Sequence, residues 1–89
     1  MYELFVKPDN YPGYIEIGIT YINNIQNILD IVKRYIESVP IDNIYGTTIL
    51  QKYKTSKFLQ VSVRDCYDND KEIYSTIYDI EAKDFIKEV

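Results

Sequence analysis

The first quarter of the chain contains two segments in which apolar and polar residues alternate. The segments "YELFV" (2–6) and "YIEIGITY" (14–21) have the two-residue period of a β-strand. Between them, "KPDNYPG" (7–13) is dense in residues that favour turns. The pattern predicts a β-hairpin. Alternation in its second strand is expected to separate the side chains onto two faces, with Ile15, Ile17, Ile19 and Tyr21 on one and Tyr14, Glu16, Gly18 and Thr20 on the other.

After this hairpin the period of the apolar residues changes. Spacings of three and four place one set of them on a single side of a helix: Ile22, Ile25, Ile28, Leu29, Val32, Tyr35, Ile36 and Val39. Asn23 is the expected N-cap, with Gln26 in the capping-box position. Pro40 cannot continue a helix, and it disfavours helical geometry at Val39. The pattern predicts one long amphipathic helix between Asn23 and Val39.

The second half of the chain is rich in β-branched and aromatic residues. After a loop at 41–46, three segments are predicted to form the strands of a meander: 47–53, 57–67 and 72–78. Connections of a few turn-forming residues join these segments, as a meander requires.

The end of the chain supports two interpretations. Apolar residues at helical spacing in 80–89 predict a short C-terminal helix, for which Asp79 would be the cap. Ile73, Ile77 and Ile80 also fit a helical period, so a single helix over 71–88 is a competing prediction.

Together these segments predict one α+β domain covering residues 1–89. Its expected order is ββαβββα, with an antiparallel sheet of about five strands. The long amphipathic helix would pack on one face of the sheet, and the other face would remain largely open to water.

Composition adds a hint about origin and a limit on partners. The chain has fifteen isoleucines and ten tyrosines but one alanine, a bias towards AT-rich codons that suggests an AT-rich genome or a mobile element. The net charge of −4 opposes binding to nucleic acid or anionic membrane, since both carry dense negative charge. A neutral or basic partner is therefore expected.

The residue types also indicate a compartment. One cysteine cannot form an internal disulfide, and no charged and apolar leader opens the sequence. No apolar run approaches the roughly 18 residues that a membrane span needs. The sequence predicts a soluble, cytoplasmic protein.

Several kinds of chemistry lack the residues they need. The chain has no histidine and one thiol, so zinc sites, iron–sulfur sites and histidine-based catalysis are not expected. Asp65 and Asp68 flank Cys66 and disfavour its thiolate, which a nucleophile requires. The three glycines form no phosphate-binding loop. We expect neither enzymatic activity nor a cofactor, and a small hydrolase acting through a carboxylate is the remaining enzymatic alternative.

A calcium loop is the one metal pattern that deserves comparison. Asp68, Asp70, Glu72 and Asp79 fall at positions 1, 3, 5 and 12 of an EF-hand loop. Position 6 of that loop must be glycine for its sharp turn, and here it is Ile73. Strands are also predicted where the motif has helices. The sequence therefore predicts a solvated turn and no metal site.

Carboxylates around this turn form the preferred candidate interface. Acidic side chains at alternate positions of a strand lie about 6.6 Å apart, so that a row of them can imitate a phosphate backbone. Tyrosine is a favoured anchor in protein interfaces. The predicted partner-binding residues are Asp65, Asp68, Asp70, Glu72, Tyr67 and Tyr74.

The resulting functional hypothesis is a small acidic, non-enzymatic protein-binding module that blocks a larger, basic partner. Size, acidity and AT-rich composition suit an inhibitor of a host nuclease or defence complex carried by a phage or mobile element, of the anti-CRISPR or anti-restriction type. An immunity protein that neutralises a cognate toxin is the alternative within the same class. Exposed strand edges would also allow a homodimer.

A different class of function is suggested by the block "KYKTSK" (52–57). Lysines next to an aromatic ring suit contact with single-stranded nucleic acid, in which the ring stacks on a base and the lysines contact phosphates. The residues of this alternative site are Lys52, Tyr53, Lys54 and Lys57.

Overall fold

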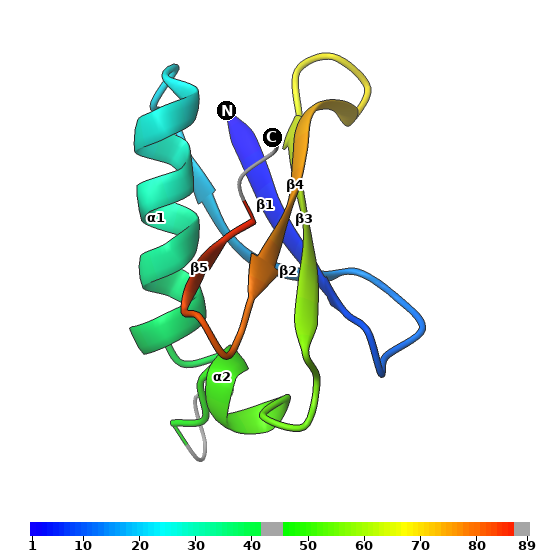
Figure 1. Ribbon diagram of the computed structural model, residues 1–89. Helices are drawn as coiled ribbons and strands as arrows, with labels where there is room; N and C mark the ends of the chain where they lie inside the picture. The colour runs from blue at the N-terminus through cyan, green and yellow to red at the C-terminus, as the bar shows by residue number, and fades with distance from the viewer. Residues whose placement is uncertain (42–45, 87–89) are drawn as a thin grey trace.

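The computed structural model describes residues 1–41 and 46–86, which form one sheet and two helices (Figure 1). The elements are β1 (Tyr2–Pro8), β2 (Ile15–Thr20), α1 (Ile25–Ser38), α2 (Ile49–Lys52), β3 (Phe58–Asp65), β4 (Lys71–Asp79) and β5 (Asp84–Phe85). The strands lie in the order β2-β1-β3-β4-β5, and every neighbouring pair is antiparallel. The predicted α+β class and the five-stranded antiparallel sheet with one long helix are confirmed. None of the helices in the described part of the chain is long and apolar enough to cross a membrane.

The core lies between α1 and one face of the sheet. Residues at alternate positions of β1 and β3 point toward the helix and meet its apolar stripe, and the buried set includes Leu4, Val6, Leu59, Val61, Val63, Ile28, Val32 and Ile36. Burial of apolar surface stabilises a fold by about 25 cal/mol per Å², so this layer supplies most of the driving force for folding.

The long helix begins one residue later than predicted. Asn24 is the N-cap, and its Oδ1 atom accepts a hydrogen bond of 3.1 Å from the backbone N–H of Asn27. Asn23 has another role, because its Oδ1 accepts from the Tyr2 hydroxyl at 2.8 Å. The helix ends at Ser38, with Val39 extended before Pro40, as the sequence predicts.

A β-bulge in β2 overturns the predicted faces of that strand. Leu4 lies opposite Gly18 while Phe5 lies opposite Glu16, so Ile17 is an extra residue without its own partner in β1. Ile17 stays on the helix side and is buried. Beyond the bulge the alternation is inverted: Thr20 is buried, and Ile19 faces the open side of the sheet.

Gly18 shows why the inverted alternation is tolerated. It faces α1, and the ring of Tyr35 lies against it so closely that a Cβ atom at Gly18 would come within 3.0 Å of the ring. The absence of a side chain at Gly18 therefore creates the space that the Tyr35 ring occupies.

Replacing Gly18 by alanine should destabilise the protein by about 1–3 kcal/mol, because the added methyl group must displace the Tyr35 ring. Urea unfolding measures this change. Gly13→Ala is the matched control, since its Cβ would meet only one ring atom, from Tyr11, at an ordinary 3.9 Å. In a Tyr35→Ala background the Gly18→Ala change should cost almost nothing, and an undiminished cost there would contradict the proposed clash.

Segment 47–53 is helical, and the predicted strand there is wrong. Thr48 caps α2: its hydroxyl accepts from the N–H of Gln51 at 3.3 Å, while the Gln51 side chain accepts from the N–H of Thr48 at 2.9 Å. This reciprocal capping box fixes one helical turn and buries Ile49 in the core. Local capping thus outweighs the strand preference of the β-branched residues.

The end of the chain also differs from both predictions. Asp79 caps a turn, its Oδ1 accepting from the N–H groups of Glu81 and Ala82, but no helix follows in the described residues. Lys83 adopts a left-handed φ of 54°, which ends the turn and redirects the chain into β5. The short C-terminal helix and the alternative helix over 71–88 are therefore wrong up to Ile86. Residues 87–89 and, in the predicted loop, 42–45 lie outside the described part.

Tyr78 connects β4 to α1 and to β5. The side chain is fully buried, its hydroxyl donates a 2.9 Å hydrogen bond to Glu37 Oε1 of α1, and its ring meets Phe85 of β5 edge to face at 5.4 Å. Burial, followed by the hydrogen bond to Glu37 and the charge of that residue, raises the pKa of Tyr78 well above its ordinary value of 10.0.

Stability should fall at alkaline pH because of Tyr78. The unfolded chain releases this phenol proton near pH 10, while the folded chain retains it. The contribution of Tyr78 to the free energy of unfolding is therefore complete below pH 10 and decreases by about 1.4 kcal/mol per pH unit above it. Chemical unfolding between pH 9 and 11 measures the slope. Tyr78→Phe should reduce the slope, whereas Tyr67→Phe at an exposed site should leave it unchanged; equal slopes for all three proteins would contradict this assignment.

Candidate functional site

The sheet face opposite α1 is uncovered in the described structure, as predicted (Figure 1). In β3 the residues that alternate with the buried set face this side: Phe58, Gln60, Ser62 and Arg64. Large apolar side chains from other segments join them, each about 40% exposed: Tyr14, Ile19, Ile77 and Ile86. Partly exposed apolar side chains gathered on one face are characteristic of interaction surfaces.

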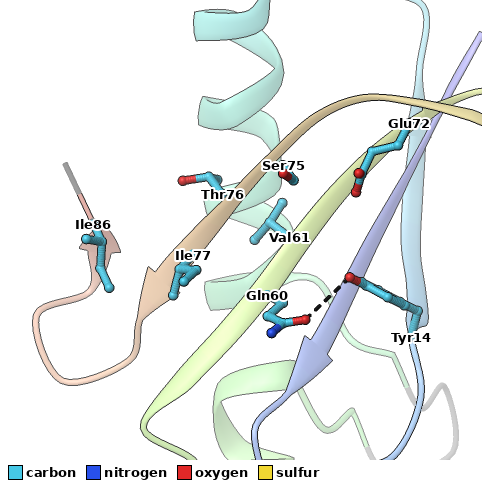
Figure 2. Close-up of a pocket in the computed structure, with 8 residues that line it drawn as sticks. All are labelled: Tyr14, Gln60, Val61, Glu72, Ser75, Thr76, Ile77 and Ile86. Carbon is cyan, nitrogen blue, oxygen red and sulfur yellow. Dashed lines mark hydrogen bonds between the residues drawn. The ribbon is translucent and has the colours of Figure 1, made fainter. Parts of the chain in front are cut away.

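A groove of about 370 Å³ runs over β3 and β4 on this open face (Figure 2). Tyr14 and Ile86 lie at its two sides, and Gln60, Ser75 and Ile77 lie between them. A second hollow of about 230 Å³ also includes Gln60, Ile77 and Ile86 and extends the groove toward Phe58 and Lys7. The two hollows share Gln60, Ile77 and Ile86 and therefore adjoin each other on the open face.

A polar network fixes one end of this groove. Ser62 is fully buried, and its hydroxyl donates a 2.7 Å hydrogen bond to Glu72 Oε1. Arg64 Nε donates to the same hydroxyl oxygen at 3.1 Å. The Arg64 guanidinium also stacks on the rings of Phe5 and Tyr14, at 4.7 and 4.9 Å from their centroids. These contacts hold the Glu72 carboxylate at the groove.

A second bulge decides where two predicted partner-binding residues point. Val63 lies opposite Tyr74, but Arg64 lies opposite Glu72, so that Ile73 is the extra residue in β4. Glu72 consequently faces the open side with Arg64, while Tyr74 faces the helix side with Val63. Strict alternation would place Glu72 and Tyr74 on the same face of the sheet, but the bulge places them on opposite faces.

Three other predicted residues gather at the tip of the β3–β4 hairpin. Tyr67, Asp68 and Asp70 are all exposed there, with 76% of the Tyr67 surface in solvent. Asn69 and Asp70 have φ angles of 53° and 57°, the conformation of a type I′ turn.

The sixth predicted residue shapes the same turn from its base. Asp65 closes β3, and its Oδ1 accepts a 2.9 Å hydrogen bond from the N–H of Tyr67. Among the described residues, no group of three or more acidic or thiol side chains has an arrangement that could hold a metal ion.

Cys66 follows β3 beside the chain's first residues. Its N–H donates to the carbonyl of Met1 at 3.1 Å. Partial burial raises the pKa of the Cys66 thiol, with further contributions from the Glu3 carboxylate, which also accepts its hydrogen bond, and from the charge of Asp70. The sequence attributed this effect to Asp65 and Asp68, whereas the fold brings Glu3 from another strand.

The alternative nucleic-acid residues lie around the end of α2. Lys52 Nζ is 6.0 Å from the ring centroid of Tyr53, and Tyr53 is half-buried with its ring edge to face against Tyr11 at 5.7 Å. Lys54 and Lys57 are exposed. The N–H of Lys57 donates to Asp9 Oδ2 at 3.0 Å, and this bond is the main reason why the pKa of Asp9 is lowered. The basic block thus lies beside a carboxylate and contains a ring already in contact with another ring.

Comparison of the chain with protein families, with curated proteins and with solved structures finds no match in any of the three.

The groove contains residues that sequence analysis did not select. Gln60, Ser75, Ile77 and Ile86 line it, and none of them was a predicted site residue. Alternation within 57–67 could have placed Gln60 on the open face. The position of Ile86 could not be found in this way, because it depends on the turn at Lys83, and the sequence predicted a helix there instead of a turn.

The reactivity of Cys66 tests the local electrostatics. Alkylation by iodoacetamide should show a midpoint above pH 9.0, because the neutral thiol is favoured. Glu3→Gln should lower this midpoint without abolishing the shift, since burial remains, while Glu16→Gln on the same face should leave it unchanged. An unchanged midpoint in Glu3→Gln would remove Glu3 as a cause.

Proposed function

We propose that this chain is a small, acidic, non-enzymatic protein-binding module that acts by occupying the basic surface of a larger protein. The residues proposed for that contact are Asp65, Asp68, Asp70, Glu72, Tyr67 and Tyr74. The exposed hairpin tip would approach the partner first, and Glu72 on the open face and Tyr74 on the helix side would extend the contact along β4. The proposal places the protein in the cytoplasm.

One observation carries this proposal: within the described residues, the acidic side chains of the β3–β4 hairpin form no ion pair with a lysine or arginine. In residues 1–41 and 46–86 a single ion pair is present, between Lys33 and Asp84 at 3.8 Å, and both side chains are substantially exposed. The carboxylates of the hairpin are therefore available to cations of another molecule. Complementary charge speeds the encounter and selects the partner.

Enzymes that handle nucleic acids supply the basic surface that this arrangement fits, because their grooves bind phosphates. A host nuclease or defence complex is therefore the proposed target, and the AT-rich composition supports an inhibitor carried by a phage or mobile element. A toxin with a basic active site would present the same chemistry, so an immunity protein is the second form of this proposal.

Charge substitution at the hairpin tip tests the proposal. The double variant Asp68→Lys with Asp70→Asn keeps a residue that tolerates left-handed geometry at position 70. Its binding to a panel of restriction and RNA-guided nucleases, measured by calorimetry and by inhibition of DNA cleavage, should be at least tenfold weaker than that of the native chain. Binding of the native chain should also weaken as salt is raised.

A matched control separates local contact from net charge. Asp30→Lys with Glu81→Gln changes the net charge by the same +3 at exposed positions away from the hairpin tip, and it should weaken binding less than twofold. Equal losses in both double variants would contradict a specific interface. Binding of an oligonucleotide that depends on Lys52, Lys54 and Lys57, without any nuclease complex, would replace the proposal with the nucleic-acid alternative.

A further inference from the structure

The groove on the open face has a stepped floor. Across β3 and β4, Gln60 lies opposite Ile77, Ser62 opposite Ser75, and Arg64 opposite Glu72. Ser62 lies opposite Ser75 but is fully buried. Ser75 is exposed, lines the groove and has a smaller side chain than Ile77 and Glu72 on either side of it, so the groove is lowest beside Ser75. A side chain of an incoming segment can enter there between the larger residues at either end.

The two ends of the groove differ in chemistry. At one end, Ile77 and Ile86 expose about two-fifths of their surface, and Phe58 adjoins them. At the other end is the Glu72 carboxylate, whose hydrogen bond within the described residues comes from Ser62. The ends are four residues apart on β3, which corresponds to about 13 Å at 3.3 Å per residue.

Nearby cations do not neutralise the carboxylate end by direct pairing. Arg64 stacks between Phe5 and Tyr14 and donates to Ser62 instead of forming an ion pair with Glu72. The groove therefore favours a cationic group over an anionic one at this end. The acidic end also disfavours a phosphate, and hence a nucleic acid strand.

We propose that the groove binds an extended segment of the partner protein that carries an aliphatic side chain and, four residues away, a lysine or arginine. The aliphatic side chain lies on Ile77 and Ile86, the basic group pairs with Glu72, and the side chain midway between them enters the hollow at Ser75. This inference rests on the proposed function and identifies the face and the chemistry of the contact.

Short peptides test the groove directly. The first probe is acetyl-Ile-Thr-Leu-Thr-Arg-amide. A second probe has the reversed sequence, because the segment could lie in either strand direction. Each probe is compared with a peptide in which glutamate replaces arginine. Amide chemical shifts of the full chain, followed by NMR during titration, should show saturable changes at Gln60, Ser75, Ile77 and Ile86. At least one arginine peptide should bind at least fivefold more tightly than its glutamate counterpart.

Two variants connect this preference to named residues. Glu72→Gln retains an oxygen that accepts from Ser62, so its fold should survive, and thermal unfolding verifies this. In the Glu72→Gln variant, the arginine peptides should bind less than twofold more tightly than their glutamate counterparts. Ile77→Ala should weaken all peptides by a similar factor, because it removes apolar contact without changing charge.

Several outcomes would overturn the groove assignment. One is the absence of saturable amide shifts with both arginine peptides. Another is that the Glu72→Gln variant still binds arginine peptides at least fivefold more tightly than glutamate peptides. Concentration-dependent shifts of the same amides without peptide would instead assign the groove to a second copy of the chain, and equal shifts with an oligothymidine would assign it to nucleic acid.

The two proposals can fail separately. A nuclease complex that is lost on changing Asp68 and Asp70 but is unaffected by Glu72→Gln and by the arginine peptides would support the proposed function and reject the groove. Peptide binding that depends on Glu72, without inhibition of any nuclease, would support the groove and reject the blocking function.

Discussion

Packing of one amphipathic helix against one face of the sheet is the constraint on which the remaining structure depends. The stripe on α1 provides enough apolar surface for one layer of contact, in which Val32 and Ile36 are fully buried. The described chain has no second long helix, so the opposite face stays in contact with water. An antiparallel sheet tolerates such an arrangement because its side chains alternate between the two faces.

Two bulges modify this simple division. The extra residues Ile17 and Ile73 interrupt alternation in β2 and β4, so each strand changes the face to which its later residues point. One bulge places Gly18 under the Tyr35 ring, and the other brings Glu72 to the groove. Each bulge therefore supports a feature that a regular strand could not provide: close helix packing in one case and a carboxylate beside Arg64 in the other.

The sequence was informative where a pattern extended over many residues. The helical period from Ile25 to Ile36 predicted α1, and alternation predicted β1 and β3. It failed where a few local contacts decided the conformation, as at the Thr48 capping box and the left-handed Lys83. The candidate groove was beyond prediction, because register between strands, and hence the meeting of Ile86 with Ile77, is a tertiary property.

The left-handed pair at the hairpin tip limits how evolution can alter the protein's charge. Asn69 and Asp70 occupy conformations that glycine, asparagine and aspartate tolerate best, so a longer acid such as glutamate would be penalised at either position whatever the partner. Drift at Asp70 among those three residue types would thus reflect the demands of the backbone. Asp68, which has no such φ, is the position where changes between acidic, neutral and basic residues would report selection by a binding partner.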